Sequence, residues 1–151
     1  MRRDFQIINN SSFDPLSPSE RSERMSRIKN SNTKPELFVR KLIYSMGYRY
    51  RLHKKNLPGH PDMVFSNKRK VIFIHGCFWH QHECKHYVMP RSRIDFWQKK
   101  LIENKNRDKR NNDLLLKYGW DILIIWECEL KEVDSLSDKI RVFLEKKNEG
   151  I

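Results

Sequence analysis

The sequence predicts a mixed α/β fold, with helices on both sides of a central sheet. Residues 71–75 and 120–126 are apolar runs rich in β-branched side chains, which is typical of buried strands. Helical periodicity with start and stop signals occurs before the first run, between the two runs and after the second. The predicted order is α-β-β-β-α-β-α, for which a mixed sheet with helices against its faces is the compact arrangement.

The first predicted helix begins at Thr33. Thr33 and Glu36 form a capping-box pattern, and Pro35 stands in the first turn. The apolar side chains that then recur at helical spacing, up to Gly47, are Phe38, Val39, Leu42, Ile43 and Met46.

Three strands follow this helix. Residues 48–52 alternate like a half-exposed strand, residues 62–65 form a short strand, and a polar turn leads into the strand at 71–75. Pairing of the last two strands would bring Asp62 and His75 to the same end of the sheet.

A long helix is expected to open at residues 92–95, which form a second capping pattern. Its middle, residues 103–113, is almost entirely charged or Asn and is therefore expected to face water or phosphate. Residues 114–116 are leucines that would return the helix to the core, and Gly119 would end it.

The last part of the chain contains the second buried strand and a final helix. Trp120 and Trp126, at the two ends of that strand, are assigned to the core. An amphipathic helix then begins at Asp134 or Ser135.

Composition points to a nucleic-acid partner. The chain of 151 residues suits one domain, and its 31 Lys and Arg against 19 Asp and Glu give a net charge of +12 and a pI near 9.8. We expect residues 1–30 to form a flexible basic arm and residues 31–151 to form a single domain. The absence of a long apolar run and of a signal peptide predicts a cytosolic protein without a membrane span.

Cysteine and histidine residues cluster after the first buried strand. Cys77, His82 and Cys84 supply three soft or borderline ligands from one short loop. Cys128 follows the second buried strand and can supply a fourth ligand if the two strands are neighbours. This set suits tetrahedral zinc, and a site closed by four protein ligands would be structural, clamping a loop with few apolar residues.

Two alternative roles for these cysteines and histidines are weaker. The chain's three cysteines could be unrelated buried thiols, but an odd number beside histidines in a reducing compartment favours a metal site. Residues 82–86 also match H-E-x-x-H, in which two histidines one helical turn apart bind zinc. That motif requires a helix, which Gly76 and Pro90 disfavour here, so His86 is interpreted as a surface histidine.

Several motifs resemble those of the very short patch repair endonucleases. They lie at residues 58–62, 71–80, 96–97, 104–110 and 119–128, and the block HGCFWH within the second is highly specific. The resemblance spans about residues 25–130. It implies a restriction-endonuclease-like fold and nicking of DNA on the 5′ side of the thymine in a G:T mismatch left by deamination of 5-methylcytosine. It also implies a monomer in the bacterial cytoplasm, at the nucleoid, working beside mismatch-repair proteins.

The resemblance also implies roles for particular residues. Asp62 and the backbone carbonyl of Ile74 would bind catalytic Mg²⁺, a cation that prefers oxygen ligands. His80 would act as general base or acid with support from His75, and Glu36 would lie near the site. Enzymes of the wider fold carry an acidic residue and a lysine on the strand that corresponds to residues 71–75. This chain has neither of them at the corresponding positions, and that departure is the repair family's own pattern.

Aromatic residues are expected to read the mismatch. The resemblance implies that Phe78, Trp79 and Trp97 wedge into the base stack, where a wobble pair lowers the unstacking cost. Phe78 and Trp79 stand on the cysteine loop, which is a poor place to bury them. Trp97 has an alternative interpretation as a core residue, because it stands at helical spacing with Ile94 and Leu101.

Basic residues of the long helix are expected to contact phosphates, setting affinity and salt dependence. They are Lys99, Lys100, Lys105, Arg107, Lys109 and Arg110. The leading hypothesis is therefore a Mg²⁺-dependent, zinc-stabilised mismatch nickase. Its rival is a non-catalytic zinc module that binds nucleic acid through basic and aromatic side chains.

Overall fold

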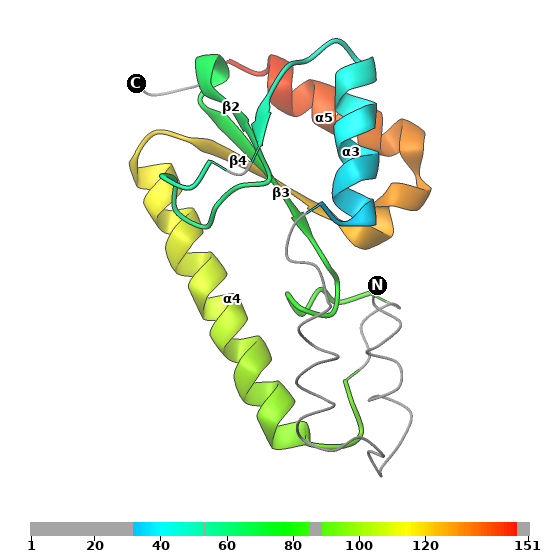
Figure 1. Ribbon diagram of the computed structural model, residues 1–151, viewed down its shortest axis with the longest axis vertical. Coiled ribbons are helices and arrows are strands. Elements are labelled where there is room, and N and C mark those ends of the chain that lie inside the picture. Colours follow the sequence, from blue (N-terminus) through cyan, green and yellow to red (C-terminus); the bar gives the residue numbers. More distant parts are fainter. Residues whose placement is uncertain (1–31, 53, 85–88, 148–151) are drawn as a thin grey trace.

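The central sheet lies between two layers of helices (Figure 1). The computed structural model describes residues 32–52, 54–84 and 89–147. The arm predicted for residues 1–30 and the histidine at position 86 lie outside these ranges. The predicted mixed α/β fold is confirmed, since the described ranges contain a four-stranded sheet and helices on both of its faces.

The sheet has the strand order β1-β2-β3-β4. Its strands are Arg51–Leu52 (β1), Met63–Phe65 (β2), Lys70–His75 (β3) and Asp121–Trp126 (β4). The first three strands pair antiparallel, whereas β3 and β4 pair parallel with His75 opposite Trp126. The carboxyl ends of β3 and β4 therefore meet at one edge, and the antiparallel register brings Asp62, directly before β2, to that same end.

The helices are α3 (Lys34–Ser45), α4 (Ile94–Lys117) and α5 (Val133–Glu145). α3 and α5 cover one face of the sheet, and α4, which connects β3 to β4, covers the other (Figure 1). The amino-terminal half of α4 extends beyond the sheet. Among the helices of the described ranges, none is both long and apolar enough to cross a membrane.

Three apolar clusters hold these layers together. The largest joins α3 and α5 to one face of the sheet. The second joins the carboxyl-terminal half of α4 to the opposite face and includes Trp120, in agreement with its core assignment. The third consists of Phe78, Trp97 and Leu101, and joins the loop after β3 to the amino-terminal half of α4.

Some predictions about the ends and faces of elements are wrong. α4 begins at Ile94 after Arg93, whose backbone is left-handed with φ 56°, and no side chain caps it, unlike the pattern expected at 92–95. Of the leucines expected to return α4 to the core only Leu115 is buried, while its neighbours on either side are 39% and 57% exposed. The strand predicted over residues 48–52 is reduced to the two exposed residues of β1.

The predicted cap of α3 is half correct. The Thr33 hydroxyl accepts a hydrogen bond from the backbone N–H of Glu36 at 3.4 Å. The Glu36 carboxylate does not return to Thr33, because it accepts from the backbone N–H of Asn32 at 2.9 Å and from Arg40 at 3.1 Å. Phe38 shares the helical spacing of the buried Val39 and Ile43 but is 40% exposed.

Gly59 lets the loop before β2 approach α4 closely. Its φ is +76°, and a Cβ atom there would lie 3.2 Å from the Phe73 ring and from the Cβ of Asn111. A larger residue would be strained and would push the loop outward. This close approach helps to set where Asp62 enters the sheet.

Candidate active site and metal centre

Four side chains with metal-binding atoms converge at the edge where β3 and β4 end. β3 leads into the loop that carries Cys77, His82 and Cys84, and β4 leads into the short 3₁₀ helix Glu127–Lys131, which carries Cys128. One ligand atom from each of the four side chains lies within 4.8 Å of the others. The parallel pairing of the two strands is what makes this convergence possible.

The chemistry of this cluster, which we call the Cys/His cluster, fits a bound metal ion. Burial is the main cause that raises the pKa of the Cys77 thiol to about 12, and burial also raises the pKa of Cys128. A divalent cation would favour the thiolate forms, and three sulfurs with one imidazole form a tetrahedral donor set. The Nδ1 atom of His82 lies 3.6 Å from the Cys128 sulfur. The cluster could therefore hold a metal ion.

The geometry supports neither alternative role for the cysteines and histidines of this loop. The three cysteines are free thiols whose sulfur atoms converge, so they are not unrelated buried residues. His82 and Glu83 lie outside any helix, which removes the geometry that H-E-x-x-H requires.

A histidine pair and a carboxylate form a second cluster beside the first. The rings of His75, at the end of β3, and His80, from the loop, stack with centroids 3.7 Å apart and planes inclined by 6°. The Nδ1 atom of His80 is hydrogen-bonded to the carboxylate of Asp108 on α4. Because an ionised carboxylate can only accept, Nδ1 carries the proton and Nε2 is left for other partners.

The environment sets the charge of this second cluster. Burial, followed by the neighbouring His80, lowers the pKa of His75 to about 3, so His75 is a neutral imidazole near pH 7. Its Nδ1 atom is buried and has no hydrogen-bond partner among the described residues. Burial, the largest single effect, would raise the pKa of Asp108, but the hydrogen bond with His80 and the nearby positive charges together outweigh it and lower that pKa. Asp108 is therefore a carboxylate that holds the His80 ring.

One ligand atom from each of His75, His80 and Asp108 lies within 4.8 Å of the others, but the orientation of the two rings disfavours a shared metal ion. Imidazole binds metals through lone pairs that lie in the plane of the ring. Two parallel rings 3.7 Å apart direct their lone pairs side by side, not toward one point between them. Both histidines could ligate one ion only after a ring rotation that breaks the stack. The arrangement suits proton transfer by His80 instead.

Asp108 is a site residue that the sequence interpretation missed. The charged run on α4 is predicted from the sequence to face water or phosphate as a whole. Asp108 stands seven residues after Leu101 and seven before Leu115, both of which are fully buried. Residues seven apart lie on the same face of a helix, so this spacing could have identified an inward carboxylate.

A second carboxylate lies on the other side of the same strand end. Asp62 accepts a hydrogen bond from the backbone N–H of Ile74 at 2.7 Å. Burial, with a smaller contribution from the negative charge of Glu36, raises the pKa of Asp62 to about 7. Glu36 itself is 4% exposed and bonded to Arg40. A partly buried carboxylate of this kind gains from a nearby cation, and the oxygen donors fit a hard one.

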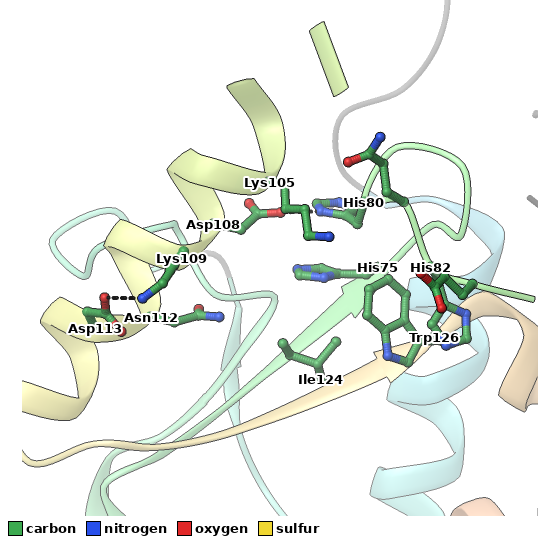
Figure 2. A pocket seen from close by; sticks show the side chains of 12 residues that line it. His75, His80, His82, Lys105, Asp108, Lys109, Asn112, Asp113, Ile124 and Trp126 are labelled. Carbon is green, nitrogen blue, oxygen red and sulfur yellow. Dashed lines mark hydrogen bonds and ion pairs between the residues drawn. The ribbon is translucent and has the colours of Figure 1, made fainter. Parts of the chain in front are cut away.

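A cavity of about 420 Å³ opens over the histidine pair. Figure 2 shows His75 and His80 directed into it, with Asp108 and Lys105 reaching in from α4 and Trp126 from β4. Asp62 is not among the described residues that line it. The histidine pair with Asp108 thus lies on one side of the end of β3, which we call the imidazole side. Asp62 lies on the other side, which we call the carboxylate side.

Comparison with known proteins identifies the family. Residues 13–86 match the family model described as DNA mismatch endonuclease Vsr. Type II nicking enzyme V.XorIIP of Xanthomonas oryzae pv. oryzae is 45% identical over 132 residues, which cover 87% of this chain and 97% of that protein. DNA mismatch endonuclease Vsr of Escherichia coli is 40% identical over 119 residues, covering 79% of this chain and 76% of that protein.

This chain belongs to the Vsr family. Another relative, type II nicking enzyme V.NmeAIP of Neisseria meningitidis, is 44% identical over 118 residues, covering 78% of this chain and 84% of that protein. A Vsr-family chain is an endonuclease, a phosphodiester hydrolase that acts on DNA. The rival hypothesis of a non-catalytic zinc module is therefore wrong.

The aromatic residues of this Vsr-family chain are more buried than the sequence indicates. Phe78 is 6% exposed and Trp97 is 2% exposed, so the expectation that Phe78 avoids burial is wrong, and Trp97 packs as its core interpretation required. Their rings meet edge to face, with centroids 5.8 Å apart, and Trp79 packs against both. Phe96, which stands in the motif at 96–97, contacts Trp97 and is 44% exposed.

Trp126 is also placed differently from its core assignment. Its side chain is partly buried, lines the cavity, and stacks on His82. The six basic residues predicted to contact phosphate are all exposed on α4. Two of them, Lys105 and Lys109, line the cavity, and the Lys109 amine bonds Asp113 at 3.2 Å (Figure 2).

Proposed function

We propose that this Vsr-family endonuclease nicks double-stranded DNA on the 5′ side of the thymine in a G:T mismatch. The observation that carries the proposal is the pairing of a His80–Asp108 acid/base unit with the Asp62 carboxylate at one strand end, in a chain 40% identical to the mismatch endonuclease of Escherichia coli. The scissile phosphate would lie over the end of β3, between the imidazole and carboxylate sides.

Asp62, with the backbone carbonyl of Ile74, would hold catalytic Mg²⁺. When bound, Mg²⁺ would supply electrostatic stabilisation of the charge that develops on the phosphate and the leaving oxygen. Glu36 adds a second buried negative charge next to Asp62, which would strengthen the attraction for a divalent cation. Mg²⁺ ligation by these groups follows from their oxygen chemistry and their burial.

His80 would remove the proton from the attacking water through Nε2. Asp108 keeps the proton on Nδ1 and would stabilise the imidazolium that forms, in the manner of a carboxylate–histidine pair. His75 is neutral and stacked on His80, so it would support the ring without adding a positive charge that opposes protonation.

Asparagine in place of Asp108 is expected to lower the single-turnover nicking rate about 100-fold. An amide can donate a hydrogen bond to Nδ1 and so permits the tautomer that carries its proton on Nε2. An amide is also uncharged and cannot balance the charge of an imidazolium. DNA affinity should stay within about twofold, since α4 retains its exposed cations. Asp138→Asn is the control, because Asp138 is an exposed carboxylate on α5 that does not line the cavity and pairs with Arg141 at 3.2 Å. Equal rates for the two variants would remove Asp108 from the mechanism.

Zn²⁺ would occupy the Cys/His cluster, held by Cys77, His82, Cys84 and Cys128. Three thiolates and one imidazole are the ligands of closed structural zinc sites. Such an ion would tie the loop after β3 to the 3₁₀ helix after β4 and so hold the loop that carries His80.

Serine in place of Cys128 is expected to weaken Zn²⁺ binding at least about 100-fold, or about 2.7 kcal/mol, because a hydroxyl is a poor zinc ligand. Thermal stability should fall with zinc content, since binding energy is folding energy in such sites. Metal analysis of the purified variant and a chelator competition measure both effects. A zinc-to-protein ratio equal to that of the unmodified chain would refute the four-ligand assignment.

Mismatch reading would use the aromatic cluster and the basic surface of α4. The Phe78, Trp79 and Trp97 rings are packed on one another, so wedging into DNA would require the cluster to exchange its own contacts for base stacking. Rigid aromatics can offset the unstacking of a wobble pair, which is already less stable than a matched one. The cations of α4 would supply affinity without sequence choice.

A cleavage panel tests this proposal. Duplexes of one sequence would carry G:T, A:C, G:A or a matched pair at one position, each end-labelled on either strand. We expect Mg²⁺-dependent nicking of the thymine strand of the G:T duplex, on the 5′ side of the thymine. Equal nicking of the matched duplex would favour a nicking enzyme without mismatch specificity, and two of the relatives are named as nicking enzymes. Binding without nicking of any duplex would overturn the proposal.

A further inference from the structure

Trp126 lies between the two side-chain clusters of the site. Its indole lines the cavity and is only partly buried. It belongs to none of the three apolar clusters found among the described residues. Core packing therefore does not account for a large aromatic side chain at this position.

The ring contacts of Trp126 connect both clusters. One face of the indole stacks on His82, with centroids 4.1 Å apart and planes inclined by 9°. It meets His75 at 5.2 Å and His80 at 6.3 Å, in edge contacts inclined by 74° and 68° (Figure 2). One side chain thus contacts a member of the Cys/His cluster and both members of the histidine pair.

The backbone of Trp126 is itself firmly held. It pairs with β3 opposite His75, and its N–H donates to the Glu129 carboxylate at 3.1 Å. Lys139 of α5 bonds that same carboxylate at 2.9 Å. The indole therefore projects from a strand end that is fixed on two sides, which suits it to hold other rings in place.

We infer that Trp126 is a positioning residue that couples the Cys/His cluster to the orientation of His80. The indole holds the ring plane of His82 and closes the side of the cavity against which the His75–His80 stack rests. The orientation of both rings matters. The ligating nitrogen of His82 must point at the metal ion, and Nε2 of His80 must point at the attacking water. The expected effect of Trp126 on the nicking rate rests on the proposed function, whereas its expected effect on metal binding does not.

Leucine in place of Trp126 tests the coupling, because it keeps an apolar side chain and removes the ring face. We expect the single-turnover nicking rate at saturating DNA to fall about 10- to 100-fold, with the DNA dissociation constant changed less than about twofold. Affinity for Zn²⁺ alone, measured by chelator competition without DNA, should fall about tenfold. Trp126→Phe retains a ring face, so its nicking rate and its Zn²⁺ affinity should lie within about threefold of those of the unmodified chain.

Trp120→Leu is the matched control. Trp120 is 8% exposed, stands just before the opposite end of β4 and packs in the cluster beneath α4, so its loss should lower the melting temperature without changing rate or zinc affinity. An unchanged rate and zinc affinity for Trp126→Leu would overturn the inference, as would failure of Trp126→Phe to restore them. A Trp126→Leu chain that does not fold would assign the residue a structural role instead. If the unmodified chain nicks no G:T duplex, the proposed substrate is wrong, and the zinc comparison still decides the role of Trp126.

Discussion

Replacement of Asp62 by asparagine is expected to reduce nicking of a G:T duplex by at least about 1000-fold while DNA binding is retained. The amide keeps the shape of the side chain and an oxygen that can accept from the Ile74 N–H, now at 2.7 Å, but it carries no negative charge. A metal-assisted displacement derives several kcal/mol of transition-state stabilisation from its cation, and about 1.4 kcal/mol corresponds to tenfold in rate. Single-turnover cleavage and a gel-shift titration measure the two properties separately.

Asp138→Asn is a suitable control for this substitution. Asp138 is an exposed carboxylate on α5 that forms a surface ion pair with Arg141, at 3.2 Å, so its variant should nick at the unmodified rate. Raising the Mg²⁺ concentration should recover part of the activity of Asp62→Asn if the main defect is cation affinity. A fully active Asp62→Asn chain at low Mg²⁺ would remove Asp62 from the metal site.

Glutamine in place of His80 is expected to slow nicking by about 100- to 10,000-fold, the range that a positioned acid/base group contributes. Glutamine can still bond Asp108 but has no nitrogen that takes up a proton near neutral pH. Because His80 and Asp108 would act as one unit, the double variant His80→Gln/Asp108→Asn should be no slower than His80→Gln alone. Single-turnover rates of the three variants at saturating Mg²⁺ test this.

His60→Asn provides the control for loss of an imidazole. His60 is exposed and has a left-handed backbone with φ 48°, a conformation that asparagine tolerates. This variant should nick and bind DNA as the unmodified chain does. Additive losses in the His80 and Asp108 variants would indicate that the two side chains act independently, contrary to the mechanism proposed here.

The sheet and much of the metal centre could be predicted because their signals are local or strongly spaced. Apolar runs with β-branched residues identified the two long strands, and the antiparallel pairing of β2 with β3 brought Asp62 and His75 to one end as expected. Three cysteines and a histidine in a loop-plus-strand-end pattern converge once the two strands are neighbours. Cysteine and histidine are the usual zinc ligands, and the chain has only three cysteines. Composition and spacing were therefore sufficient to predict these four ligands.

The remaining site residues depended on helix phase and packing, which local patterns describe poorly. Asp108 lies in a charged run, where its seven-residue spacing from Leu101 and Leu115 is a weak signal, and the packing of α4 on the sheet is what brings it to His80. The sequence predicts little burial for Phe78, yet α4 offers it Trp97 and Leu101 as partners. Trp126 has the hydropathy of a core residue but ends its strand at the cavity.

From the sequence alone one obtains the mixed α/β class, the four convergent ligands and the resemblance to a nuclease family, because each depends on residue type and order along the chain. The tertiary structure decided that Asp108 holds His80, that Phe78, Trp79 and Trp97 are packed together, and that Trp126 contacts both clusters. These are contacts between α4, the loop after β3 and the end of β4. His80 and Asp108, for example, lie 28 positions apart in the sequence, and the packing of α4 on the sheet brings them within reach.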